Sequence, residues 1–414
     1  MKTVKSWRTS VCVVLCAMLF HSICNAEDAI SSYSELLKQI GNTLSDNPTG
    51  RPLPLATDCW QFRPLKKEFE QKEAVPFLIQ VIQQGPDWQD EYKGKIRLTP
   101  HVARGYAALC LAYTRDERAF PVLIELLEKG KPLIDINTLH NEIIEEQKRL
   151  DELYHPMVSR GGSAIPPLNS SEAGTLMKEL QQDYDIRTFA AASLGILKDT
   201  RAVSALVKTL KDQNEMVRYH SVLALAEIPD MRTIEPILQA ATMYKIDDIA
   251  VSRAMKKMTK YRLNIEFNSV NNIVTIPDYP ELGIVQYEEG KSKYVFREIW
   301  SRWYQNGKSL LEKKYKEKYD EYIKTKKDPS QLEETRSRTR QDIVSLGVPA
   351  LPMIIQKIEQ GETDLVPVVA VLTNNEISKD ANQTEVLQWW KENKERWIIF
   401  KEEQSTASTE AKAA

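Results

Sequence analysis

One phrase occurs three times in this chain: an arginine, eleven further residues, and an aspartate followed two positions later by another arginine. The three copies run from Arg104 to Asp116, from Arg187 to Asp199 and from Arg218 to Asp230. The last two aspartates lie 31 residues apart. A period of this length, combined with helically spaced apolar residues, is typical of stacked two-helix repeats. This pattern constrains the fold far more than it constrains the activity.

The residues before each aspartate predict the first helix of a repeat. In the middle copy, small or apolar side chains recur at Ile186, Phe189, Ala190, Ser193 and Leu194. This spacing places them on one face of an amphipathic helix. The aspartate that follows lies in a turn, where its carboxylate can accept the free N–H groups that open the next helix.

A second helix follows each turn and begins with an alanine, an apolar residue and a proline. The motif starts at Ala74, Ala119 and Ala350, with looser copies at Ala202 and Thr233. Proline is tolerated near a helix start and not in a helix interior, so each copy marks a start. Five second helices imply about five helical pairs, which can bury a continuous core.

A family resemblance follows from the motif that runs from Val217-Arg218 to Asp230-x-Arg232. Residues 186–241, and less closely 73–130, resemble HEAT repeats of the short kind found in phycobilisome-lyase-type proteins. The resemblance implies an all-α fold, a right-handed, armadillo-type α-solenoid of HEAT-like helical pairs. It also implies a structural ladder between repeats, in which turn aspartates pair with helix arginines. The members of this ladder would be Arg104, Asp116, Arg187, Asp199, Arg218 and Asp230.

The first 26 residues predict a signal peptide. Lys2, Lys5 and Arg8 precede the apolar run 11–20, and small residues up to Ala26 suit a signal peptidase. The apolar run is shorter than the ~20 residues of a membrane-spanning helix. We therefore expect cleavage near Ala26 and an exported protein, periplasmic or secreted, without a membrane span.

Composition and periodicity divide the rest of the chain. Residues 262–296 switch to the two-residue period of strands, which predicts a β-rich insertion closed by a hairpin of 284–287 and 293–296. The tail 401–414 has too little apolar content to fold. The other expected segments are an N-terminal helix and Pro-rich linker (27–62), HEAT-like repeats (63–130 and 185–261), an insertion (131–184), a tryptophan helix with a charged linker helix (297–342) and a C-terminal HEAT-like tryptophan module (343–400).

The C-terminal half contains a second duplication. Trp303 and Asn306 recur 87 residues later as Trp390 and Asn393. This pattern is similar to the end module of exported bacterial HEAT proteins. Terminal repeats need closure, so we interpret Trp300, Trp303, Trp390 and Trp397 as packing residues.

Trp389 is the exception among the tryptophans. Its side chain points about 100° away from that of Trp390 on a helix, so the two are not expected to be buried equally. We expect Trp389 to be exposed and to serve as an anchor for a partner, because tryptophan is enriched at binding hot spots.

Residues that could carry chemistry are few. His220 occupies the helix column of Tyr106 and Phe189, which favours a packed core histidine. Glu152 and His155 have the Glu-x-x-His spacing of di-iron helices, but a single copy without partners is a weak signal. We find no catalytic or phosphate-binding motif. We therefore expect no enzyme activity, metal or cofactor.

Cys59 and Cys110 are the two cysteines that remain after cleavage. In an oxidising compartment they could form one disulfide. The alternative is a buried thiol at Cys110, which is in register with Ser193 and Ala224 at a small packing position. The spacing does not decide between the two, because it says nothing of distance in the fold.

Surface charge indicates a protein partner. The formal net charge is −2, and charges of both signs are spread along the chain, which gives no reason to expect nucleic acid. We therefore predict an exported, non-enzymatic HEAT-repeat scaffold that binds a protein or peptide. A phycobilin-lyase-like enzyme and a structural subunit of an envelope assembly are the alternatives. Besides Trp389, the expected contact residues are Arg118, Arg201, Lys208, Lys211 and Arg232.

Overall fold

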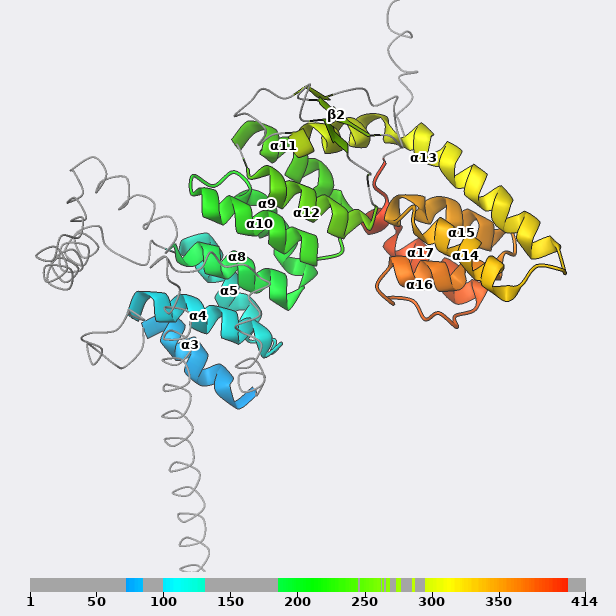
Figure 1. The fold of residues 1–414 in the computed structure, drawn as a ribbon. Helices are drawn as coiled ribbons and strands as arrows, with labels where there is room; N and C mark the ends of the chain where they lie inside the picture. Colours follow the sequence, from blue (N-terminus) through cyan, green and yellow to red (C-terminus); the bar gives the residue numbers. More distant parts are fainter. Residues whose placement is uncertain are drawn as a thin grey trace, which may run out of the picture. The chain divides into compact units, whose positions relative to one another are not determined.

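Figure 1 shows the computed structural model of the chain, which falls into two units divided after Leu197. The predicted signal peptide 1–26, linker 27–62, insertion 131–184 and tail 401–414 lie outside the residues that the structure describes. The described residues are 72–84, 100–130, 185–244, 246–261, 263, 266–268, 273–276, 285–286 and 295–400.

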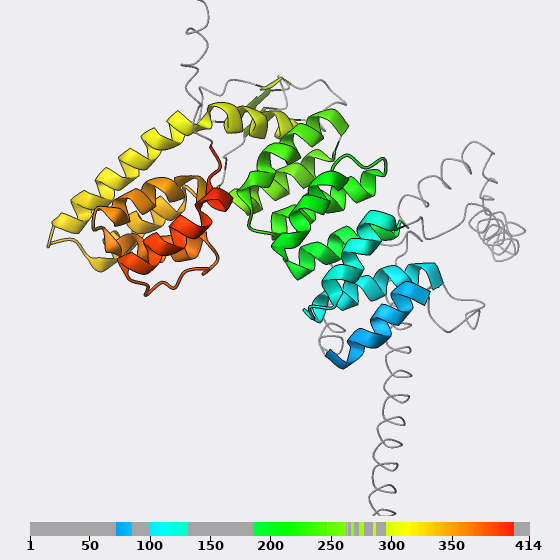
Figure 2. The same cartoon turned by 180° about the vertical axis from the view of Figure 1, so that it is seen from behind.

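The first unit is a small stack of helices. Helix α4 packs against α3 on one side and α8 on the other, and α5 also packs against α8 (Figures 1 and 2). Helices α4 and α8 approach closely at Gly105 of α4, where a Cβ atom would lie 2.7 Å from the ring of Phe189. The elements are η2 (Lys72–Ala74), α3 (Val75–Gln84), α4 (Pro100–Tyr113), α5 (Ala119–Lys129) and α8 (Ile186–Leu197).

The second unit begins with two more helical pairs. Helix α10 packs against α9 and α12, and α11 packs against α12. The predicted second helices begin where the alanine-proline motif and its looser copies indicated, within one residue. The elements are η3 (Thr200–Ala202), α9 (Val203–Thr209), α10 (Glu215–Glu227), η4 (Met231–Thr233), α11 (Ile234–Tyr244) and α12 (Asp248–Thr259).

Three short strands lie within 262–296: β1 (Glu266–Asn268), β2 (Ile273–Thr275) and β3 (Val285–Gln286). They form one antiparallel sheet in the order β1-β2-β3. The prediction of a second hairpin arm at 293–296 is wrong, because Val295 and Phe296 begin helix α13. The cause is Asp248 of α12, whose carboxylate accepts the backbone N–H groups of Phe296 and Arg297 at 2.5 and 2.7 Å. These are donors that a helix start leaves without an intrahelical partner.

The C-terminal helices begin with α13, the helix that Asp248 caps. Helix α13 packs against α11 and α12 and also against α14, so the expected tryptophan helix and charged helix begin as one continuous helix (Figure 1). Tyr315 and Tyr322 lie buried along it. The elements are α13 (Val295–Lys327), α14 (Glu333–Val344), η7 (Val348–Ala350), α15 (Leu351–Glu359), η8 (Thr363–Leu365), α16 (Val366–Leu372) and α17 (Gln383–Trp397).

An aromatic cluster around Trp303 forms the core of this second unit. The ring of Trp303 stacks on Tyr261 at 5.6 Å and meets Trp300 edge-on at 5.4 Å and Phe400 at 5.2 Å. Trp300 and Trp303 are fully buried, and Trp397 is 1% exposed. The packing role predicted for these three tryptophans is confirmed. The fourth, Trp390, is half-buried.

Candidate functional site

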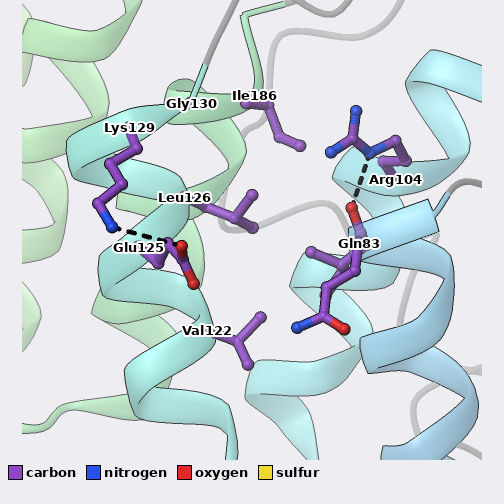
Figure 3. Close-up of a pocket in the computed structure, with 9 residues that line it drawn as sticks. Gln83, Arg104, Val122, Glu125, Leu126, Lys129, Gly130 and Ile186 are labelled. Atoms are coloured by element: carbon purple, nitrogen blue, oxygen red, sulfur yellow. Dashed lines mark hydrogen bonds and ion pairs between the residues drawn. The ribbon is translucent and has the colours of Figure 1, made fainter.

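A cavity of about 400 Å³ opens between three helices of the first unit (Figure 3). Helices α3 and α4 supply one side, α5 supplies the other, and the start of α8 contributes Ile186. In Figure 3, Arg104 and Gln83 project toward Val122 and Leu126 across this space. The described lining residues are Ile82, Gln83, Arg104, Val122, Glu125, Leu126, Lys129, Gly130 and Ile186.

Arg104 is the most distinctive residue of this lining. Its Nε atom donates a 2.7 Å hydrogen bond to the carbonyl oxygen of Ile82. That carbonyl lies in the last turn of α3, where oxygens have no intrahelical donor and cations are favoured. Burial lowers the pKa of the guanidinium from its ordinary value. Among the described residues, no carboxylate lies within ion-pair distance of Arg104.

The opposite side of the cavity, formed by α5, carries an ion pair next to apolar side chains. Lys129 Nζ lies 3.5 Å from Glu125 Oε1, and both side chains are exposed at the surface of α5. Leu126 is largely buried beside them. The cavity therefore offers an apolar wall together with a half-buried cation and a solvated ion pair.

Gly130 fixes how closely α5 approaches α8 at one end of the cavity. Its N–H donates to the carbonyl of Leu126 at 2.9 Å and closes the last turn of α5. A Cβ atom at this position would lie 2.3 Å from that carbonyl and 2.7 Å from Ile186 Cγ2. Only glycine fits this approach, so the residue sets the position of Ile186 in the lining.

The predicted ladder between repeats is wrong in its pairing. The turn aspartates instead pair with the arginines two residues later, and Asp185 pairs in the same way with Arg187 at 2.6 Å. Arg218 donates to the carbonyls of Asp212 and Gln213, and Arg104 donates to that of Ile82. The physical reason is proximity: the backbone N–H and the guanidinium of residue i+2 both reach the carboxylate, which costs little ordering entropy. The pairs are Asp116–Arg118, Asp185–Arg187, Asp199–Arg201 and Asp230–Arg232.

The predicted contact residues lie at the surface, outside the cavity described above. The side chains of Arg118, Arg201 and Arg232 are 53%, 62% and 61% exposed while they pair with their aspartates. Lys208 and Lys211 are exposed near the end of α9. None of these five residues lines the cavity described above.

Trp389 is less exposed than the sequence predicted. It is half-buried, as is Trp390, so the expected contrast between the two is absent. Its ring lies 6.1 Å from that of Trp397 and 6.2 Å from that of Trp390. The reason is that the helix brings Trp397, two turns later, back beside Trp389, and the three rings shield one another.

Cys110 is a free thiol buried in α4. Cys59 itself lies outside the described residues. Burial raises the pKa of the Cys110 thiol to about 12. This thiol is packed as the small-residue alternative predicted.

His220 is a fully buried core residue, as its helix column predicted. Burial lowers its pKa to about 4, so the imidazole is neutral at physiological pH. Within the described ranges, no three histidine, cysteine, aspartate or glutamate side chains gather as metal ligands. Glu152 and His155 fall outside those ranges. Nor does any described helix combine the length and the apolar character needed to cross a membrane.

The stacked helical pairs, with an aspartate at each turn, define a helical-repeat protein. Sequence comparison refines that class: a model of HEAT repeats matches residues 174–251, and a model of the PBS lyase HEAT-like repeat matches residues 103–129. The chain therefore contains HEAT repeats in these segments. No curated protein matches it significantly.

The cavity could not be read from the sequence. Arg104 is marked in the sequence by a repeated phrase, but that phrase predicts a ladder between repeats and not a cavity. Its acceptor, Ile82, lies 22 residues away, and Ile186 reaches the cavity from beyond the insertion. Only the packing of α3, α4, α5 and α8 brings these residues together.

Proposed function

We propose that this chain is an exported, non-enzymatic HEAT-repeat scaffold that binds a protein or peptide partner. The observation that carries the proposal is the cavity of the first unit. Its volume of about 400 Å³ lies in the range of ligand sites, roughly 300 to 1,000 Å³. It combines apolar walls with a few oriented polar groups, as binding sites do.

Repeat architecture supports a polypeptide as the ligand. Stacked repeats create extended surfaces that suit extended partners. The exposed arginines Arg118, Arg201 and Arg232 add to such surfaces, because each is held by its aspartate and loses little freedom on binding. Export is the part of the proposal that rests on the N-terminal sequence alone, with its basic start, apolar run and small residues before Ala26.

A phycobilin-lyase-like enzyme is the second candidate, because one observation favours it. The segment that matches the PBS lyase HEAT-like repeat, residues 103–129, supplies five of the nine cavity residues. On this alternative the cavity would hold part of a tetrapyrrole instead of a peptide. A structural subunit of an envelope assembly is a third reading, and it predicts a stable complex with other subunits.

Affinity capture with the full-length chain tests the proposal. The baits are the wild-type chain, Val122→Phe, which fills the cavity with a larger ring, and Arg253→Gln, a loss of charge at an exposed residue of α12. The expected result is a polypeptide, identified by mass spectrometry, that is captured by wild type and Arg253→Gln and lost with Val122→Phe.

Two other outcomes would overturn parts of the proposal. Capture of a coloured tetrapyrrole without a polypeptide would replace the scaffold by the lyase-like alternative. Equal capture by all three baits would remove the cavity as the binding site. Export is tested separately, by fractionation of the producing cells and N-terminal sequencing, and a start at Met1 in the cytoplasmic fraction would contradict it.

A further inference from the structure

We propose that the cavity between α3, α4 and α5 binds the free C-terminal carboxylate of a peptide whose last residue is aliphatic, with Arg104 as the carboxylate receptor. This inference rests on the proposed function and names the part of the partner that the cavity takes. It is carried by the geometry of Arg104 and by the composition of the cavity walls.

The first step is the state of Arg104. A guanidinium has five N–H donors, and the bond to the Ile82 carbonyl uses only the one on Nε. Among the described residues, neither Nη atom donates to an acceptor, although the side chain is half-buried. A half-buried cation without a carboxylate partner is costly unless something else balances its charge.

The second step is the direction in which Arg104 is held. The 2.7 Å bond to Ile82 fixes Nε at the end of α3, and Figure 3 shows the guanidinium on the side that faces α5. The two Nη atoms can therefore donate hydrogen bonds to both oxygens of a carboxylate, which is the bidentate geometry that arginine favours. Because the bond to Ile82 orients the group beforehand, little entropy is lost when the ligand binds.

The third step is the rest of the wall. Val122 and Leu126 of α5 and Ile186 of α8 present branched aliphatic side chains to the same space. They suit an aliphatic side chain next to the carboxylate, which is the chemistry of a C-terminal leucine or valine. The Gln83 amide, on the same side as Arg104, can hydrogen-bond to the last peptide group.

A chain end fits this site better than an internal acidic residue does. Gly130 and Ile186 lie together at one end of the cavity, where a Cβ atom on Gly130 would come within 2.7 Å of Ile186. A chain terminus needs only one exit, whereas an internal aspartate or glutamate needs room for backbone on both sides.

Fluorescence anisotropy with the full-length chain tests the inference. The probes are three fluorescein-labelled peptides: Gly-Ser-Gly-Ser-Val-Leu with a free carboxylate, the same peptide as its C-terminal amide, and an amidated peptide in which an internal glutamate replaces the second serine. The free acid is expected to bind roughly tenfold or more tightly than either amide.

Arg104→Gln should abolish this preference, Arg104→Lys should keep part of it, and Arg253→Gln should leave it unchanged. Val122→Phe, which leaves Arg104 in place, should weaken the binding of all three probes by blocking the cavity. Thermal unfolding followed by circular dichroism shows whether each variant folds, so a folding defect is not read as a lost site.

The inference fails if acid and amide bind with equal affinity, if no probe binds wild type, or if the preference survives Arg104→Gln. Preference for the internal glutamate would replace the chain end by an acidic side chain and so overturn it too. Affinity capture and probe binding together distinguish failure of this inference from failure of the proposed function. Capture of a protein partner that persists with Arg104→Gln would leave the scaffold standing without this site, and probe binding without any captured protein would do the reverse.

Discussion

The Asp230 carboxylate accepts three hydrogen bonds from Arg232. The backbone N–H donates to Oδ1 at 3.1 Å, Nε donates to Oδ1 at 2.8 Å, and Nη2 donates to Oδ2 at 2.5 Å. The aspartate side chain is 1% exposed, whereas that of the arginine is 61% exposed. One residue thus closes the turn from the inside while its partner shields it from solvent.

Replacing Asp230 by alanine should destabilise the protein by about 1 to 3 kcal/mol, because the part-buried backbone N–H of Arg232 loses its acceptor and the guanidinium loses its partner. Asp199→Ala should cost less, since the Asp199 carboxylate is 18% exposed and water can replace it. Arg232→Ala, which leaves the cap in place, serves as the control. Urea unfolding of the three variants measures the difference, and equal losses for Asp230 and Asp199 would contradict the argument.

His220 should make stability depend on pH below neutrality. The unfolded chain takes up a proton near pH 6.5, whereas the folded imidazole, whose pKa burial lowers, does so only near pH 4. The free energy of unfolding therefore falls as the pH drops from about 6.5 to about 4, by at most about 3 kcal/mol. His220→Phe, the residue type of the neighbouring repeat, should remove this contribution.

Asp248 opposes His220 and has to be separated from it. Burial raises the pKa of Asp248 to about 6, so the folded state binds this proton before the unfolded state and gains stability as the pH falls from about 6 to about 4. The informative quantity is the difference in the free energy of unfolding between wild type and His220→Phe. Both proteins contain Asp248, so its contribution cancels in this difference. A difference that stays constant between pH 7 and pH 4 would rule out the imidazole as its source.

Cys110 should resist alkylation in the folded protein. The thiol is 3% exposed and its pKa is raised by burial, so the reactive thiolate is scarce and shielded. Iodoacetamide should label it only after urea is added, and peptide mapping reads it separately from the other cysteines. Cys110→Ala, the residue type at the matching Ala224, should change stability little. Fast labelling without urea would show that α4 opens locally.

Trp303→Ala should cost about 3 to 5 kcal/mol, because it leaves a large cavity among Tyr261, Trp300 and Phe400. The matched variant is Trp390→Ala, at the duplicated position 87 residues later. Its side chain is half-buried, so part of its contact area is already in water and the loss should be clearly smaller. Thermal unfolding compares the two, and similar losses would show that the duplicated positions are energetically equivalent.

Local patterns predicted the parts of the fold that local chemistry determines. The alanine-proline motif marked the start of α5 at Ala119. Asp199 and Asp230 cap the helical turns η3 and η4 that follow them, and Asp116 accepts the N–H of Arg118 just before α5. The partner of each aspartate was wrong because residue i+2 lies closer than any residue of the next repeat. The same pair at Asp185 and Arg187 was overlooked, since it precedes a first helix instead of a second one.

Long-range relationships were not predictable in this way. The start of α13 depends on Asp248, nearly fifty residues earlier, so a strand-like pattern at Val295 and Phe296 was overridden by a cap supplied from another helix. The cavity likewise needs Arg104 and Ile186 to meet across an insertion. Periodicity describes which face of a helix is buried, but not which side chains of other helices it meets.

The cap that Asp248 provides has a consequence for how the second unit comes apart. The composition of the β-rich segment 262–296 suggests a domain boundary. Expressing the parts before and after it separately would remove the Asp248 acceptor from the first N–H groups of α13 and would separate Tyr261 from Trp303. Arg396 also reaches back to the carbonyl of Pro229. The repeats and the C-terminal helices of this unit are therefore one cooperative folding body, joined by side chains across a boundary that the chain itself suggests.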